Sequence, residues 1–437
     1  MQGAAFTYIP CVGVGGGSLA DTSATPGRLC CMDVLSPRLP LELLELIVDY
    51  IRDDDVDDMD FYSDFDEYRT LRACCLVCRT LLPRSRGNLL RRVRIMDMGQ
   101  LRSFAWMLDT VVENRALVLE LVVLSIAAQP SPADSCAPVL AGKLPRLRCL
   151  RLRTEMGPVP DPTMRPAVRM HRSAFASLSS FQQLVELQLS GLRFLQYKHF
   201  LRLVSSAPKL SVLQCMQLWF NPPKTGSTSD LFIPTHPPVR QLRLYHVDLA
   251  FIPRAVMAGL FRAIEPSSVK HLVITPNKAP LADDVESTYG DVAKFRNLES
   301  FTFFIAVAED GAEYAEVLGL LALLGHNVRT ITLSHYLHGA ARNHIVPKRS
   351  MIDALRRNAD ELQRSLDPGR FSADTRVVVQ FQDFHGSEAW WTKELEPILP
   401  NLFKVQHDPG GRYLSVKNVT YSDWSPWEDD KDRSAPS

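Results

Sequence analysis

The feature that most constrains the fold of this chain is a short apolar pattern that recurs about every 29 residues after residue 100. Each copy has the form apolar-x-x-apolar-x-apolar, which is typical of a short strand with one buried side. The copies begin at Val118, Leu147, Leu184, Leu210, Val239, Val269, Leu298 and Val328. Most copies follow a stretch with helical periodicity, for example residues 199–208, 252–264 and 313–325.

A helix-and-strand unit of this length cannot bury its own apolar side, whereas units stacked side by side can. The repeat therefore predicts an α/β solenoid with a curved parallel sheet and helices along its outer face. After residue 334 the spacing changes, and residues 350–366 with 376–384 indicate one longer unit. Residues 388–407 indicate a last unit, in which Trp390 and Trp391 are expected to help close the end of the stack.

A second feature lies near the front of the chain, where RLPLELLELIVDYIR at residues 38–52 predicts a helix. At about 100° per residue from Leu41 onward, the carboxylates and the terminal arginine fall within one arc of roughly 80°. Aliphatic and aromatic side chains fill most of the remaining circumference, about twice the width that a surface helix needs. Such a helix must be covered on two sides, by its own domain and by a further layer or another protein.

Composition divides the chain into four parts. They are a leader over residues 1–35, a helical segment over 36–95, a repeat domain over 96–420 and a polar tail over 421–437. The leader and the tail are expected to be disordered, and the leader lacks the pattern of a secretory signal. Residues 53–67 carry nine carboxylates and are expected to form a solvated loop. Helical periodicity resumes over residues 68–82, and Pro83 is expected to interrupt it.

Charge and cysteine content limit the classes of partner. Lys plus Arg equals Asp plus Glu, at 49 each, so the whole chain has no general attraction for nucleic acid or an acidic membrane. No apolar run reaches the roughly 18 residues of a membrane span. The nine cysteines form no regular ladder, which indicates a reducing compartment, the cytoplasm or the nucleus.

Two segments of the helical part resemble an F-box. The first is Leu39-Pro40 followed by ELLELIVDYI, and the second is LRACCLVCRTLLPRSR at residues 71–86 with its Leu-Val-Cys-Arg core at 76–79. The units after residue 100 are similar to the degenerate leucine-rich-like repeats that often follow an F-box, notably in families expanded in fungi. The chain departs from the family pattern in its acidic insert and in the absence of a Trp after Arg79.

The resemblance implies a non-enzymatic, substrate-recruiting subunit of an SCF-type cullin–RING ubiquitin ligase. The helical part would bind a Skp-type adaptor, and the leucine-rich-repeat-like domain would bind an unidentified protein substrate. The positions that carry over as the adaptor-binding surface or its immediate support are Leu39, Pro40, Leu43, Leu44, Ile47, Ile51, Leu76 and Val77. The alternative is a repeat scaffold with no ligase partner, whose first helix packs on the first repeat and caps the stack.

Residues on the strand face could recognise the substrate, although they could equally be solvated. They are Arg151, Arg153, Gln188, Gln214, Arg243 and Thr302. The arginines of residues 84–94 form a local basic cluster that could bind an anion or face the acidic insert.

Other candidate chemistry has simpler interpretations. Cys75 and Cys78 lack two further ligands at zinc spacing and are expected to be buried small hydrophobes. His335, His338 and His344 are expected to be exposed loop histidines rather than metal ligands. The glycine-rich residues 13–18 match no phosphate-binding loop, and the acidic insert lacks the ligand spacing of an EF-hand. No acid, base or nucleophile constellation is evident, so no catalytic residue, cofactor or metal is predicted.

Overall fold

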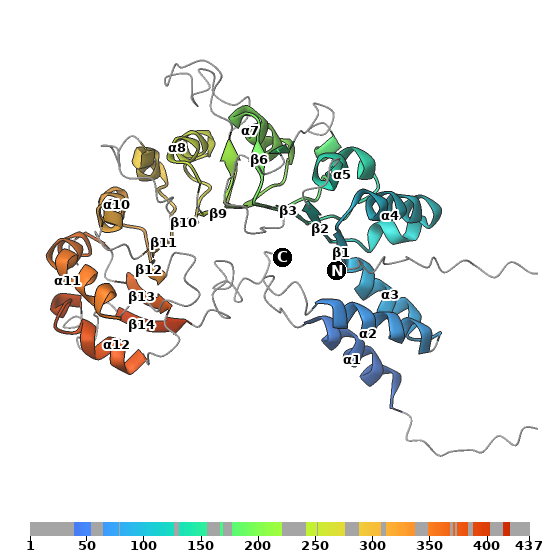
Figure 1. The fold of residues 1–437 in the computed structure, drawn as a ribbon, viewed down its shortest axis with the longest axis horizontal. Coiled ribbons are helices and arrows are strands. Elements are labelled where there is room, and N and C mark those ends of the chain that lie inside the picture. The colour runs from blue at the N-terminus through green and yellow to red at the C-terminus, as the bar shows by residue number, and fades with distance from the viewer. Residues whose placement is uncertain are drawn as a thin grey trace, which may run out of the picture.

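The computed structural model describes most of the helical segment and of the repeat domain. The described residues are 39–53, 64–77, 79–125, 131–154, 167–168, 177–220, 242–250, 252–275, 288–306, 312–336, 348–367, 370–371, 374–382, 388–402 and 414–419. Their strands line the inside of an arc and their helices cover its outside (Figure 1). Helices α1 to α3 lie at one end of the arc, and α12 lies at the other (Figure 1). The predicted leader and tail fall outside the described residues.

Eleven of the described strands form one long sheet in which every neighbouring pair is parallel and the spatial order follows the chain order. Its strands are β1 (Arg92–Ile95), β2 (Glu120–Ser125), β3 (Cys149–Thr154), β5 (Glu186–Ser190), β7 (Val212–Met216), β9 (His246–Ala250), β10 (His271–Thr275), β11 (Ser300–Ala306), β12 (Thr330–Tyr336), β13 (Arg376–Gln382) and β14 (Leu414–Val419). Each strand thus adds to the one before it, as stacking of units requires. The predicted fold class, a repeat solenoid with a curved parallel sheet, is confirmed.

Helices connect the strands on the outer face. They are α4 (Met98–Thr110), α5 (Pro132–Leu140), α7 (Tyr197–Ser206), α8 (Arg254–Ala263), α10 (Ala312–Leu323), α11 (Lys348–Ser365) and α12 (Glu388–Leu395), with the 3-10 turns η1 (Val112–Ala116) and η4 (Gly290–Lys294). A small second sheet joins β4 (Ala167–Val168), β6 (Arg193–Phe194) and β8 (Trp219–Phe220). The helices predicted over 199–208, 252–264, 313–325 and 350–366 are present within two residues of the expected bounds.

The alternation within each strand separates the core from the inner face of the arc. In β5, Leu187 and Leu189 are buried in the core, whereas Glu186 and Gln188 lie on the opposite side. The register repeats this division from strand to strand, so that one row of core side chains runs through Leu150, Leu187, Leu213, Val247 and Leu272. The core of the repeats is therefore continuous rather than divided into separate clusters.

The turns that precede β11 and β12 are tied to the preceding unit by asparagine side chains. The Asn297 side chain donates a hydrogen bond of 2.8 Å to the Ser267 carbonyl, and the Asn327 side chain donates one of 2.6 Å to the Arg296 carbonyl. These bonds satisfy backbone acceptors that no helix or strand uses. They also hold successive units at the same offset.

The strand predicted from Val239 is wrong by several residues. The sheet uses His246–Ala250, and Leu242 forms only an isolated bridge with Ile264. Two overlapping patterns of alternating apolar and polar residues occur in this stretch. The later pattern forms the strand, because it places Val247 and Leu249 beside the core residues of β7. Arg243 consequently lies outside the strand face, where it is exposed and pairs with Glu265 at 2.7 Å.

The first and last strands of the sheet were not predicted. β1 follows the helical segment directly, so that the sheet begins at Arg92 rather than after residue 95. Its four residues are too short to stand out as a separate pattern beside the preceding helix. β14 extends the sheet beyond the last predicted unit.

Stacked rings cover the carboxyl-terminal end of the core. The rings of Phe381 and Trp391 are parallel with centroids 3.9 Å apart, and the His335 ring stacks on Phe381 at 4.9 Å. Trp391 is fully buried, and Trp390 packs against the same core. Both tryptophans therefore lie at this end of the stack, as expected.

The prediction that His335 is an exposed loop residue is wrong, because it lies in β12 and is 1% exposed. His338 and His344 fall outside the described residues. The Nδ1 atom of His335 lies 3.2 Å from the Gln380 carbonyl, and Nε2 lies 2.5 Å from the Tyr314 hydroxyl. Since a carbonyl only accepts, Nδ1 carries the proton and Nε2 accepts from Tyr314. Burial lowers the pKa of His335 to about 4.

None of the helices that the structure describes is both long and apolar enough to cross a bilayer.

We expect His335 to make the stability of the solenoid depend on pH. The unfolded imidazole, with a pKa of about 6.5, takes up a proton before the folded one does. The free energy of unfolding should therefore fall as the pH drops through 6.5 toward 4, by about 2 kcal/mol at about pH 5. Denaturant unfolding at about pH 7.5 and pH 5 measures this loss. In a His335→Gln variant, which keeps a donor and an acceptor but does not titrate, the loss should be smaller by that amount. An equal loss in both proteins would contradict this assignment.

Candidate protein-docking surface

The helices before the sheet form a separate small unit, called here the N-terminal module. It consists of α1 (Leu41–Asp53), α2 (Asp64–Val77) and α3 (Leu82–Arg91). Val48, Leu71 and Leu81 form its core, which is distinct from the core of the repeats. Half-buried side chains pack around this core, namely Leu44, Ile51, Cys74 and Leu89.

Local sequence explains where these helices begin. The Pro40 carbonyl accepts hydrogen bonds from the amides of Leu43 and Leu44, which opens α1. Residues 64–67 were predicted to be loop but form the first turn of α2. Pro83 was predicted to interrupt a helix but instead lies in the first turn of α3, where its missing amide hydrogen costs nothing.

The charged arc of α1 contacts α3. The Arg84 guanidinium pairs with the Asp49 carboxylate, with Nε 2.7 Å from Oδ1. The Asn88 amide donates to the Val48 carbonyl at 3.1 Å and to Asp49 at 3.0 Å. The hydrogen bond from Arg84 is the main reason that the pKa of Asp49 lies below its usual value. These contacts fix how α1 is turned within the module.

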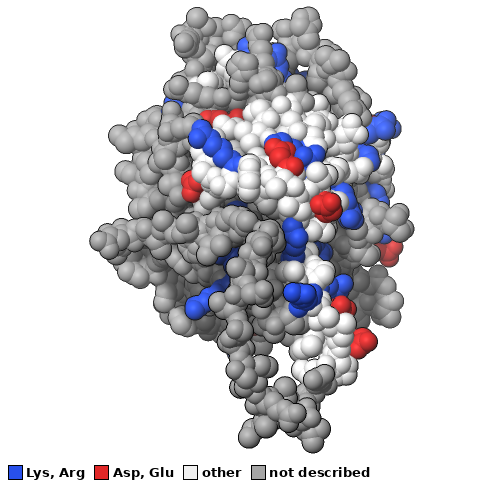
Figure 2. Space-filling model, turned by 90° about the vertical axis from the view of Figure 1, so that its right-hand side faces the viewer, with Lys and Arg blue, Asp and Glu red and all other residues white. Residues whose placement is uncertain are grey.

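With α1 turned in this way, a second apolar arc of the helix points to solvent. Leu43, Leu46, Ile47 and Tyr50 lie at spacing i, i+3, i+4 and i+7 and are all exposed, Leu46 by 62% and Tyr50 by 70%. Leu39 and Pro40 continue this surface at the start of the helix. We call these six residues the apolar stripe. In the lower part of Figure 2, uncharged surface of the described residues is bordered by a few blue and red side chains.

The residues that the F-box resemblance singled out divide into three groups. Leu39, Pro40, Leu43 and Ile47 lie in the apolar stripe, and Leu76 of α2 is 82% exposed. Leu44 and Ile51 instead pack against the core of the module and support α1 from inside. The side chain of Val77 falls outside the described residues. Leu46 and Tyr50 were missed, although their spacing from Leu43 places them on the same helix face.

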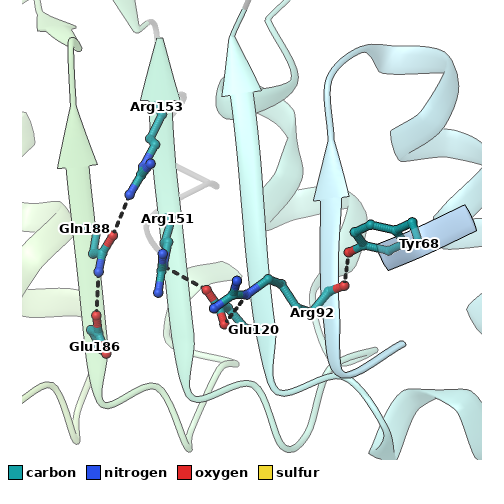
Figure 3. Close-up of polar contacts among 7 residues, drawn as sticks. All are labelled: Tyr68, Arg92, Glu120, Arg151, Arg153, Glu186 and Gln188. Carbon is teal, nitrogen blue, oxygen red and sulfur yellow. Dashed lines mark hydrogen bonds and ion pairs between the residues drawn. The ribbon is translucent and has the colours of Figure 1, made fainter. Parts of the chain in front are cut away.

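The N-terminal module joins the sheet without an intervening loop. α3 ends at Arg91 and β1 begins at Arg92. The Tyr68 hydroxyl of α2 donates to the Arg92 carbonyl (Figure 3), and the Leu119 amide donates to the Arg91 carbonyl at 2.9 Å. The junction is therefore held by hydrogen bonds from both sides.

Next to this junction, charged side chains gather on the inner face of the sheet. We call the four arginines of β1 and β3 the arginine cluster; they are Arg92, Arg94, Arg151 and Arg153. Glu120 of β2 lies 2.8 Å from Nε of both Arg92 and Arg151, although the second contact is not aligned as a hydrogen bond. Arg153 donates to Gln188 at 3.2 Å, and Gln188 donates to Glu186 at 2.6 Å (Figure 3).

Most of the strand-face residues named from the sequence do share this inner face. Arg151, Gln188, Gln214 and Thr302 occupy one row across the sheet, and Arg153 lies in the next row. Asp248 follows Gln214 in the row and is fully buried, which raises its pKa well above the usual range. The arginine cluster is thus at the end of the face nearest the N-terminal module.

The structure gives no support for metal chemistry among the residues it describes. No group of three or more His, Cys, Asp and Glu side chains there is placed to hold a metal ion. Cys74 and Cys75 are half-buried and form no disulfide, and Cys74 packs against the core of the module. Cys78 falls outside the described residues.

Comparisons with known proteins add little to this picture. No protein-family model matches the chain, and no curated protein matches it. A similar solved structure is the crystal structure of the Rad7 and Elc1 complex in yeast, at 12% sequence identity and a TM-score of 0.29. The match covers 80% of this chain and 91% of that chain. Similarity of this degree identifies neither a shared partner nor a shared activity.

Two leucines of α2 give a matched test of how the module divides its apolar residues. We expect Leu71→Ala to destabilise the module by about 2–5 kcal/mol, because Leu71 is 2% exposed and its removal leaves a cavity. Leu76→Ala should change stability by no more than about 0.5 kcal/mol, because that side chain already faces solvent. Hydrogen exchange of the α1 and α3 amides measures both effects. Similar protection in the two variants would contradict this division.

Proposed function

We propose that this protein is a non-enzymatic, substrate-recruiting F-box subunit of an SCF-type cullin–RING ubiquitin ligase. The observation that carries the proposal is the apolar stripe, an exposed row of aliphatic and aromatic side chains on the helix that follows Leu39-Pro40. In this proposal the stripe and Leu76 bind a Skp-type adaptor. The repeats bind a protein substrate, and no residue of the chain has a catalytic role.

The size of the stripe is suited to a stable protein contact. Fully burying an aliphatic or aromatic side chain contributes about 1.5–3 kcal/mol. The exposed members of α1 would together offset the cost of association, which is at least about 4 kcal/mol. Asp49 of the same helix is already paired with Arg84 and Asn88 of α3, so its charge is turned away from the stripe.

The exposure of the stripe favours this proposal over a scaffold without a ligase partner. In the scaffold alternative, the apolar arc of residues 41–51 would pack on the first repeat. α1 instead packs against α2 and α3, and its outer arc remains open to solvent. Apolar surface of this kind on a folded protein usually marks an interaction site.

The repeats would act by holding a substrate near the ubiquitin-loading machinery. Tethering raises the effective concentration of two reactants without any new chemical group. The inner face of the arc is the surface that solenoid proteins commonly use for binding. The cytoplasm and the nucleus, where cysteines stay reduced, are the compartments in which we expect this assembly.

Co-purification tests the proposal. The full chain, expressed together with a Skp-type adaptor, should capture the adaptor. A variant with Leu39→Asp, Leu43→Asp and Ile47→Asp should not, because three carboxylates would have to be desolvated at the interface. These three side chains are exposed, so the variant should melt at the same temperature as the wild type.

Val112→Asp provides the matched control, since Val112 is an exposed aliphatic residue on the repeats rather than on the module. It should capture the adaptor as the wild type does. Equal recovery of the adaptor by the triple variant would rule out the proposed interface. Loss of recovery by both variants would mean that the stripe is not the determinant.

A further inference from the structure

We propose that the arginine cluster on the inner face of β1 and β3 binds an extended acidic segment of the substrate. This inference rests on the proposed function and names the chemical class of substrate that the repeats would recruit. The partner is a peptide with carboxylate or phosphate groups on alternate residues. Its main chain would run along the strands.

Among the described strand residues on this part of the face, positive side chains outnumber negative ones. The inner-face residues of β1, β2, β3 and β5 include four arginines and two glutamates, a net charge of +2. Glu120 is shared between Arg92 and Arg151, so one carboxylate serves two guanidinium groups. From β7 to β14, the Lys, Arg, Asp and Glu residues on the described inner face are Asp248, Arg376 and Lys417, so a second group of four arginines does not occur among these described strands. An anionic ligand would therefore be attracted to the end of the face next to the N-terminal module.

The spacing of the arginines matches an extended chain. Arg151 and Arg153 lie two residues apart on β3, as Arg92 and Arg94 do on β1. Alternate residues of a strand lie about 6.6–6.8 Å apart on one side. Alternate side chains of an extended peptide have the same separation, so two successive acidic side chains can each meet one arginine of a strand. A guanidinium group can bind a carboxylate or a phosphate through two parallel hydrogen bonds.

The surroundings of the arginines would strengthen such contacts. The side chain of Arg151 is 12% exposed, and burial lowers the pKa of Arg153. Both observations describe cations that have lost much of their hydration, where an added negative charge is screened less than at an open surface. Gln188 accepts a hydrogen bond from Arg153 and so helps to hold this guanidinium group on the inner face.

Fluorescence anisotropy with the full chain tests this inference without the adaptor. The probe is a labelled peptide of about seven residues with Glu at alternate positions and Ala between them. We expect it to bind, and to bind less tightly as NaCl is added. The same peptide with Gln in place of Glu should bind at least about tenfold more weakly. A phosphoserine peptide of the same spacing shows whether phosphate or carboxylate is the preferred anion, and tighter binding of either supports the inference.

The double variant Arg94→Gln with Arg153→Gln should lose at least about tenfold in affinity for the Glu peptide. Arg376→Gln is the matched control, because Arg376 is an inner-face arginine on β13 at the far end of the arc, and it should bind normally. If the double variant fails to fold, Arg94→Gln alone provides the comparison.

Equal binding of the Glu and Gln peptides, or unchanged binding by the variant, would overturn the inference. So would an oligonucleotide that binds more tightly than the peptide and loses binding in the same variant. Adaptor capture is measured separately, so failure here leaves the adaptor proposal untouched.

Discussion

The whole architecture depends on one requirement, that the apolar side of every strand and helix unit is covered by its neighbours. In-register parallel pairing meets this requirement from β1 to β14, because each strand places its core residues beside those of the previous one. The two ends of the sheet have a neighbour on one side only. Near the carboxyl-terminal end, Trp391 of α12 stacks on Phe381, which in turn stacks on His335. At the other end, β1 is anchored to the N-terminal module through the contact of Tyr68 with Arg92.

The N-terminal module meets a different constraint, because α1 must divide its side chains among three directions. Its charged arc binds Arg84 and Asn88 of α3, its inner aliphatic arc fills a small core, and its outer apolar arc stays exposed. The polar contacts are what decide which aliphatic residues face outward. Adjacent residues consequently differ in exposure to solvent: Val48 is buried, whereas Ile47 is half exposed. The apolar stripe thus results from the way α1 is held, in addition to its composition.

Periodicity was sufficient to predict the solenoid and most of its strands, because the core row repeats a pattern that local alternation displays. It failed at β9, where two overlapping alternations occur and only pairing with β7 distinguishes them. It also failed at His335, whose burial depends on partners about 20 and 45 residues away in the sequence. For the candidate site, the F-box resemblance identified Leu43 and Ile47 but could not separate them from Leu44 and Ile51. The arginine cluster was not predicted as a group, because its arginines lie on two strands, residues 92–95 and 149–154. The first strand was not recognised in the sequence, since its four residues directly follow a helix.

The direct passage from α3 into β1 has a consequence for how the two halves of the molecule would work together. In the proposed ubiquitin ligase, a flexible tether would let the repeats sample many orientations and offer many lysines of a captured protein to an incoming ubiquitin. Here the junction is hydrogen-bonded on both sides and has no spare residues, so the arc would act as a stiff arm of fixed length and direction. Geometry, more than reactivity, would then select which lysines are modified. Inserting a short Gly-Ser segment between Arg91 and Arg92 would broaden that selection while leaving both binding surfaces intact.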